Sequence, residues 1–190
     1  MNRFLRILKH RWYDETDAQR ALALALRGNW QTELGHIGEA KRLGRAAVDL
    51  ADSAGDATTA AFARQRLAQI HDQEGDGDAA ISVLQPLLAW AARLDDRNEQ
   101  SEFYNLYAIV LDNTDRGREA RAYHQHALDA CRIVQAWNGV VTVLGNLAIS
   151  WATAGYMPRA IEVLREALQL AAAHDEARGC AASLPAEMFK

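Results

Sequence analysis

The side chains best suited to chemistry in this chain are two histidines and two cysteines, and their spacing argues against catalysis or metal binding. His124 and His126 lie two residues apart in a segment with helical periodicity. Such residues point about 200° apart, so they cannot share a metal ion, and we expect one packed and one solvated imidazole. Cys131 and Cys180 have neither zinc-site spacing nor the density of a disulfide scaffold, which indicates reduced thiols.

Two acidic clusters resemble the paired carboxylates of acid–base catalysis. They are Asp14-Glu15 with Asp17, and Asp95-Asp96. Both stand at expected helix starts, where acids cap free N–H groups and favour the helix dipole. The motifs G-x-x-x-x-G-K-[ST], H-E-x-x-H and G-x-S-x-G do not occur in the sequence. The sequence therefore predicts a protein that is not an enzyme, with no cofactor and no metal site.

A row of amides is the feature that suggests binding. Gln65, Gln69 and Gln73 recur every four residues, so they drift by only about 40° per step along one helical face. Amides both donate and accept hydrogen bonds, so they can hold the backbone of an extended peptide whatever its side chains are. A solvated helix face accounts for the same residues, since glutamine is mostly exposed in proteins.

The elements that carry these residues repeat with a period of 40. Small residues recur at Ala40, Ala80, Ala120 and Ala160. Turn residues precede them by five positions, at Gly35, Gly75, Asp115 and Gly155. Apolar residues follow by eight, at Val48, Leu88, Leu128 and Leu168. Periods of roughly 20–50 residues indicate one supersecondary unit stacked on itself.

The fourth unit predicts a helix–turn–helix pair. Its first helix has apolar residues at i, i+3, i+4 and i+7, namely Leu144, Leu147, Ala148 and Trp151. Gly155 ends this helix, and the second helix carries a stripe of Ala160, Val163, Leu164, Ala167 and Leu168. The small residues allow the two helices to approach closely.

Three positions depart from this template. Asp115 replaces the turn glycine of the third unit, so we expect a different turn there. Pro86 lies inside the second helix of unit two and should kink or shorten it. Gln31 and His71 take the place of bulky apolar residues, which predicts looser packing.

This pattern of a small residue, a bulky residue three on, a turn glycine and two alanines seven apart resembles the tetratricopeptide repeat (TPR) family over residues 15–174. The 40-residue period is similar to that of TPR domains in bacterial regulators and adaptors. The resemblance implies an all-α fold: a right-handed superhelical solenoid of four TPR-like helix pairs with capping helices at both ends. The predicted single domain (1–190) holds repeats at approximately 15–54, 55–94, 95–134 and 135–174.

Both ends carry further expectations. Residues 1–14 are predicted to form an N-terminal capping helix. Their basic, amphipathic pattern also suits a membrane surface, but burial of Phe4, Ile7 and Leu8 against the first repeat is favoured. Residues 175–190 form either a C-terminal cap or a partial fifth repeat of a longer protein.

The resemblance also implies a concave groove lined by the first helix of each pair. The expected peptide-binding residues are Gln65, Gln69, Asp72, Gln73, Glu102, Asn105, Asp112 and Asn113. The expected lining holds acids and no cation, which argues against a clamp for a C-terminal carboxylate and for a neutral or basic partner.

Composition sets the function class. The net charge of -4 gives no electrostatic footprint for nucleic acid, and no apolar run reaches the roughly 20 residues of a membrane span. With these classes excluded, the TPR resemblance implies a cytoplasmic adaptor or regulatory scaffold that binds a protein or peptide. The alternatives are a self-associating structural module, such as a homodimer, and a detached sensory TPR segment of a larger bacterial transcriptional regulator.

Overall fold

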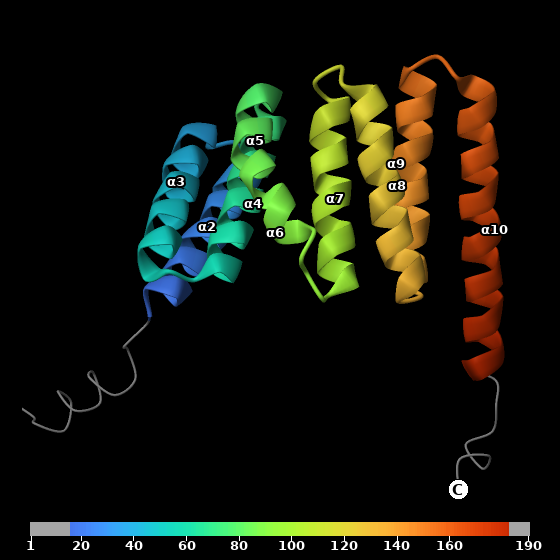
Figure 1. Cartoon of the computed structure of the whole chain (residues 1–190), viewed down its shortest axis with the longest axis horizontal. Helices are drawn as coiled ribbons and strands as arrows, with labels where there is room; N and C mark the ends of the chain where they lie inside the picture. The colour runs from blue at the N-terminus through green and yellow to red at the C-terminus, as the bar shows by residue number, and fades with distance from the viewer. Residues whose placement is uncertain (1–15, 183–190) are drawn as a thin grey trace, which may run out of the picture. The chain divides into compact units, whose positions relative to one another are not determined.

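The computed structural model describes the backbone of residues 16–182 and the side chains of residues 16–174. The predicted cap at residues 1–14 lies outside this range. Between residues 16 and 182 the chain forms only helices and the turns that join them, which confirms the predicted all-α class. The first four helices are α2 (Asp17–Glu33), α3 (Ile37–Ala54), α4 (Ala57–Gln73) and α5 (Gly77–Leu84). After a break follow α7 (Arg97–Asp112), α8 (Gly117–Ile133), α9 (Trp137–Thr153) and α10 (Met157–Ala182) (Figure 1).

Consecutive helices pack in pairs, as the repeat predicts: α2 with α3, α4 with α5, α7 with α8, and α9 with α10. The alanines that define the period, Ala40, Ala80, Ala120 and Ala160, are all buried. In the first pair the backbones approach so closely that a Cβ at Gly28 would lie 3.2 Å from the carbonyl oxygen of Ala40. Small residues at these positions therefore set the spacing of each pair.

The turn inside each pair uses a left-handed residue. The φ angles of Gly35, Gly75 and Gly155 are 79°, 84° and 82°, and Asp115 has a φ of 58°. The expectation of a different turn at Asp115 was therefore wrong. Aspartate is one of the few residues with a side chain that tolerates this conformation, because its short polar group bonds locally.

The second helix of unit two is interrupted where Pro86 predicted. Helix α5 ends at Leu84, a 3₁₀ turn η1 covers Gln85–Leu87, and α6 covers Leu88–Ala91. Proline has no N–H to donate and its ring clashes with the preceding turn, so a regular helix cannot continue. The chain divides into two compact units at this place, between Leu87 and Leu88, and each unit is described separately.

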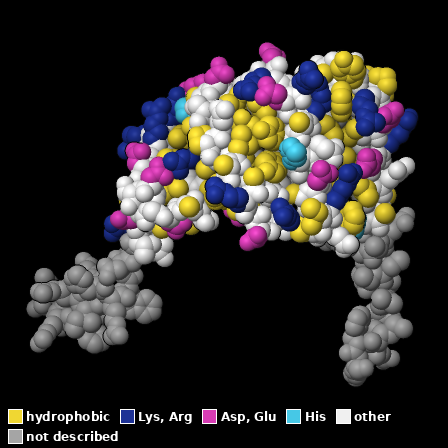
Figure 2. All heavy atoms as spheres, in the orientation of Figure 1, with side chains coloured by type: hydrophobic (Ala, Val, Ile, Leu, Met, Phe, Trp, Pro, Cys, Tyr) yellow, Lys and Arg dark blue, Asp and Glu magenta, His cyan; other side chains and the backbone are white. Residues whose placement is uncertain are grey.

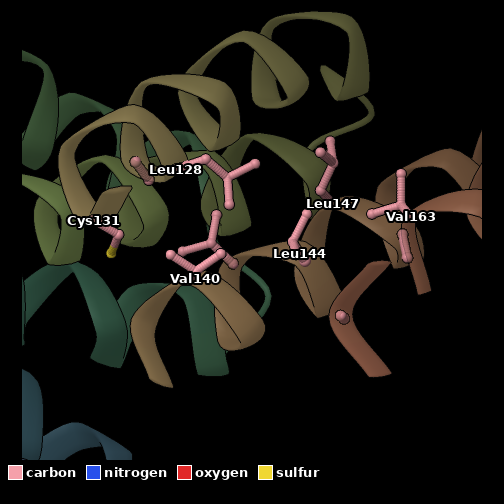
Figure 3. Packing of buried hydrophobic residues seen from close by; sticks show 10 residues of the cluster. Leu128, Cys131, Val140, Leu144, Leu147 and Val163 are labelled. Atoms are coloured by element: carbon pink, nitrogen blue, oxygen red, sulfur yellow. The ribbon is translucent and has the colours of Figure 1, made fainter. Parts of the chain in front are cut away.

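The core of the second unit joins α8, α9 and α10. Leu128 contacts a cluster that contains Val140, Leu144, Leu147 and Val163 (Figure 3). Each buried side chain of this size stabilises the fold by about 1.5–3 kcal/mol relative to an exposed one. Helix α10 then runs past residue 175 without the turn that ends the other second helices. None of the helices described here is long and apolar enough to cross a membrane.

Candidate binding groove

The predicted amides of the first unit lie on α4. Gln65 and Gln69 are half-buried and Gln73 is exposed, and Asp72 is half-buried beside them. The side-chain oxygen of Gln69 accepts a 2.8 Å hydrogen bond from Arg66, whose guanidinium lies 4.7 Å from the centre of the Phe62 ring. The acceptor oxygen of Gln69 in the predicted row of amides is thus already in use. The cation beside it, Arg66, was not part of the predicted lining.

The predicted residues of the second unit line two cavities between α7 and α9. The larger has a volume of about 300 Å³, and Glu102 and Asn105 of α7 face it together with Thr142 of α9. Ser101 and Cys131 are buried at its inner wall, with Oγ and Sγ 2.8 Å apart. Sequence analysis named Cys131 but missed its contact with Ser101, because the two residues lie 30 positions apart and follow no motif.

Gly139 is required for this arrangement. A Cβ at Gly139 would lie 2.7 Å from the sulfur of Cys131, closer than atoms pack. Helix α9 can therefore approach the end of α8 only because residue 139 has no side chain.

The smaller cavity has a volume of about 160 Å³ and continues along the same two helices. Ile109 and Asn113 of α7 and Asn146 and Ile149 of α9 form its walls. Asn146 donates a 3.1 Å hydrogen bond to the side-chain oxygen of Asn105. No lysine or arginine is among the residues that line either cavity. We call the two cavities together the α7–α9 groove.

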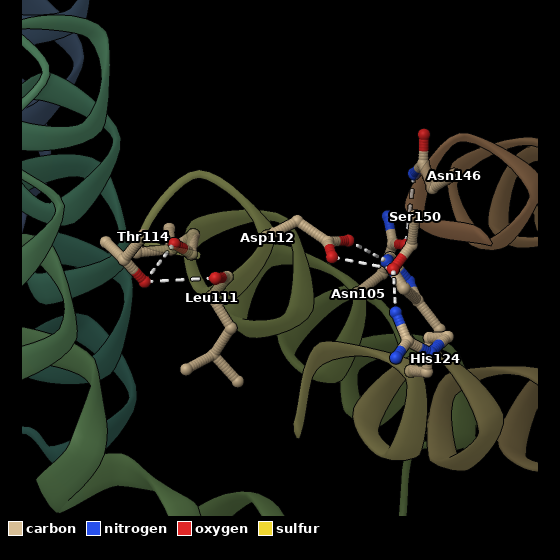
Figure 4. A network of polar contacts seen from close by, with 9 residues as sticks. Asn105, Leu111, Asp112, Thr114, His124, Asn146 and Ser150 are labelled. Atoms are coloured by element: carbon tan, nitrogen blue, oxygen red, sulfur yellow. Dashed lines mark hydrogen bonds and ion pairs between the residues drawn. The ribbon is translucent and has the colours of Figure 1, made fainter. Parts of the chain in front are cut away.

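Asp112 lies at the inner wall of the smaller cavity and is held inside the unit (Figure 4). One carboxylate oxygen lies 3.1 Å from Nε2 of His124, and the other accepts a 2.6 Å hydrogen bond from Ser150. Ser150 donates to the carboxylate rather than to the imidazole, so His124 is not placed as a base for this hydroxyl. Asp112 is thus a link between three helices.

The histidine prediction is confirmed. His124 is fully buried and His126 is exposed. Figure 2 shows Lys and Arg, Asp and Glu, and hydrophobic side chains interspersed on the face in view. Outside the groove, burial raises the pKa of the Tyr107 phenol on α7, with a smaller contribution from Tyr123.

No protein-family model matches this chain, and no curated protein does. Among solved structures it is similar to BtubC (BKLC) from P. vanneervenii, with a TM-score of 0.76 and 16% identity over 89% of this chain and 70% of that one. It is also similar to MamA, a TPR-like protein, with a TM-score of 0.61 and 17% identity over 90% and 86%. At these identities the likeness shows the fold, a TPR-like helical repeat.

Proposed function

We propose that the chain is a non-enzymatic interaction module that holds a peptide or helix of a partner protein in the α7–α9 groove. The observation that carries this proposal is the pair of cavities along two neighbouring helices. Their walls combine amides and hydroxyls for backbone hydrogen bonds, such as Asn105 and Thr142, with apolar side chains, such as Ile109 and Ile149.

The charge of the groove suits a neutral or basic ligand. Glu102 is an exposed acid at the larger cavity, and Asp112 lies at the smaller one. A carboxylate ligand would need cationic donors, which the lining of both cavities lacks. Binding of a basic ligand should weaken as salt screens these charges.

The test begins with a pull-down from the native host to identify a partner, followed by calorimetric titration of the captured segment. Asn105→Ala combined with Thr142→Ala should weaken binding about tenfold or more, because a lost buried hydrogen bond costs roughly 1–3 kcal/mol. Gln169→Ala is the control, since this exposed amide lies on α10 outside both cavities. Equal affinity for the double variant and the parent would show that the partner binds elsewhere.

A second candidate function, self-association, rests on an apolar stripe on α10. Met157, Ile161, Leu164 and Leu168 are exposed, whereas Leu84 and Leu128, which correspond to the last two in earlier repeats, are buried. If two copies pair through this stripe, Leu168→Asp should reduce the dimer in sedimentation experiments. Ile133→Asp should not, although both side chains are 69% exposed. A parent chain that is monomeric at high concentration would remove this candidate.

A further inference from the structure

The turn between α4 and α5 brings residues 71 and 76 face to face. The N–H of Asp76 donates a 2.9 Å hydrogen bond to the carbonyl of His71, and Gly75 between them is left-handed. The equivalent turn of the first repeat, between α2 and α3, pairs the side chains of Gln31 and His36, which form a 2.8 Å hydrogen bond. Only the second repeat places a histidine and an acid at these two positions.

His71 lacks the bond that this geometry offers. Its side chain is 7% exposed, and its Nδ1 is buried without a hydrogen-bond partner. Asp76 Oδ2 lies 3.6 Å away, beyond hydrogen-bond distance. A buried polar atom left in this state is costly, so an unpartnered nitrogen aimed at a carboxylate calls for an explanation.

A carboxylate of Glu74 completes the cluster, since one ligand atom from each of the three side chains lies within 4.8 Å of the others. Bonds from zinc to imidazole nitrogen and carboxylate oxygen are about 2.0–2.2 Å, so two ligands of a tetrahedral ion lie about 3.3–3.6 Å apart. The 3.6 Å between His71 and Asp76 is close to this separation. We propose that His71, Glu74 and Asp76 form a binding site for a divalent transition-metal ion of the zinc class.

The donor set fixes the class of ion. One imidazole with two carboxylates suits zinc, cobalt or nickel, whereas magnesium prefers oxygen ligands alone. Three protein ligands leave a fourth position for water. The ammonium of Lys41 lies 2.6 Å from Glu74 and competes with the ion for this carboxylate. We therefore expect micromolar affinity rather than that of a closed structural site.

The test is calorimetric titration of the full chain with Zn²⁺ at neutral pH, beside titration with Mg²⁺. The parent should bind one Zn²⁺ at this site and should not bind Mg²⁺. His71→Gln and Asp76→Asn should each weaken binding at least tenfold. Asp76 also caps α5 through a 3.2 Å bond from the N–H of Ala79, and asparagine caps equally well, so Asp76→Asn retains the fold. Lys41→Gln should tighten binding, because it removes the competing cation.

Two controls separate this site from general attraction of a cation. Asp78→Asn makes the same charge change two residues along, at an exposed side chain outside the cluster. His36→Gln removes an exposed histidine at the matching turn of the first repeat. Both should bind like the parent. Absence of Zn²⁺ binding, or a loss in the controls equal to that in His71→Gln and Asp76→Asn, would overturn the proposal, and binding that Lys41→Gln leaves unchanged would remove Glu74 from the ligand set.

Discussion

At the residue scale, Asp112 shows how a side chain predicted to face a ligand serves the fold. Its two oxygens are partners of buried His124 and of Ser150, on two other helices. Asp112→Ala leaves both groups without their acceptor, so the free energy of unfolding should fall by about 1–3 kcal/mol. Urea denaturation measures this change. Glu102→Gln, at an exposed position of the same helix, should leave stability unchanged. An Asp112→Ala protein as stable as the parent would contradict the network.

Tyr107 makes the second unit sensitive to alkaline pH. Its side chain is 3% exposed, and burial raises the pKa of its phenol. The unfolded phenol ionises near pH 10, before the folded one, so deprotonation favours unfolding and stability falls as pH rises above about 10. Tyr107→Phe should remove the fall in the free energy of unfolding that ionisation of this phenol causes. Denaturation curves at pH 8 and at pH above 10 measure the difference. The control is Tyr156→Phe, at an exposed phenol: this variant should lose as much stability between pH 8 and pH above 10 as the parent does.

At the element scale, the left-handed turn residues should be intolerant of side chains. Gly155 has a φ of 82°, where an L-residue costs about 1–2 kcal/mol, so Gly155→Ala should destabilise the protein by about 1 kcal/mol. Gly145 lies inside α9 with open space where a Cβ would lie, so Gly145→Ala should stabilise the protein by roughly 0.5–1 kcal/mol. Melting temperatures should move in opposite directions, and a shared direction would contradict the turn assignment.

The sequence predicted elements better than contacts between them. The period of Ala40, Ala80, Ala120 and Ala160 predicted the helix pairs, because a packed stripe constrains residue size at fixed spacing. The break at Pro86 followed from local chemistry. The turn at Asp115 was missed because aspartate can adopt the glycine conformation.

The contact of Ser101 with Cys131 depends on packing across 30 residues, and no local pattern contains it. The approach of His71 to Asp76 could have been found, since its signal is a pair five residues apart across the turn glycine.

At the scale of the whole molecule, left-handed residues recur every 20 positions between residues 35 and 155, with one exception. Left-handed residues occur at positions 35, 55, 75, 115, 135 and 155, and none occurs at 95 within the part of the chain that the structure describes. The interrupted stretch α5–η1–α6 precedes that position, and the division into two units falls inside it. In stacked repeats each unit is stabilised mainly by its neighbours, so a break in the array weakens cooperativity across it.

This division predicts that a defect in one unit stays there. Ala148 is 1% exposed in the core of the second unit, and Ala148→Trp overpacks it at a cost of typically ~1–3 kcal/mol. Amide exchange followed by mass spectrometry should then accelerate in α7 to α10, whereas α2 to α4 should keep the parent's protection. Arg159→Trp places the same ring at an exposed position of α10 and should change neither region. Faster exchange throughout both units in Ala148→Trp would show that the chain unfolds as one cooperative array, with the break at Pro86 bridged by interactions that span it.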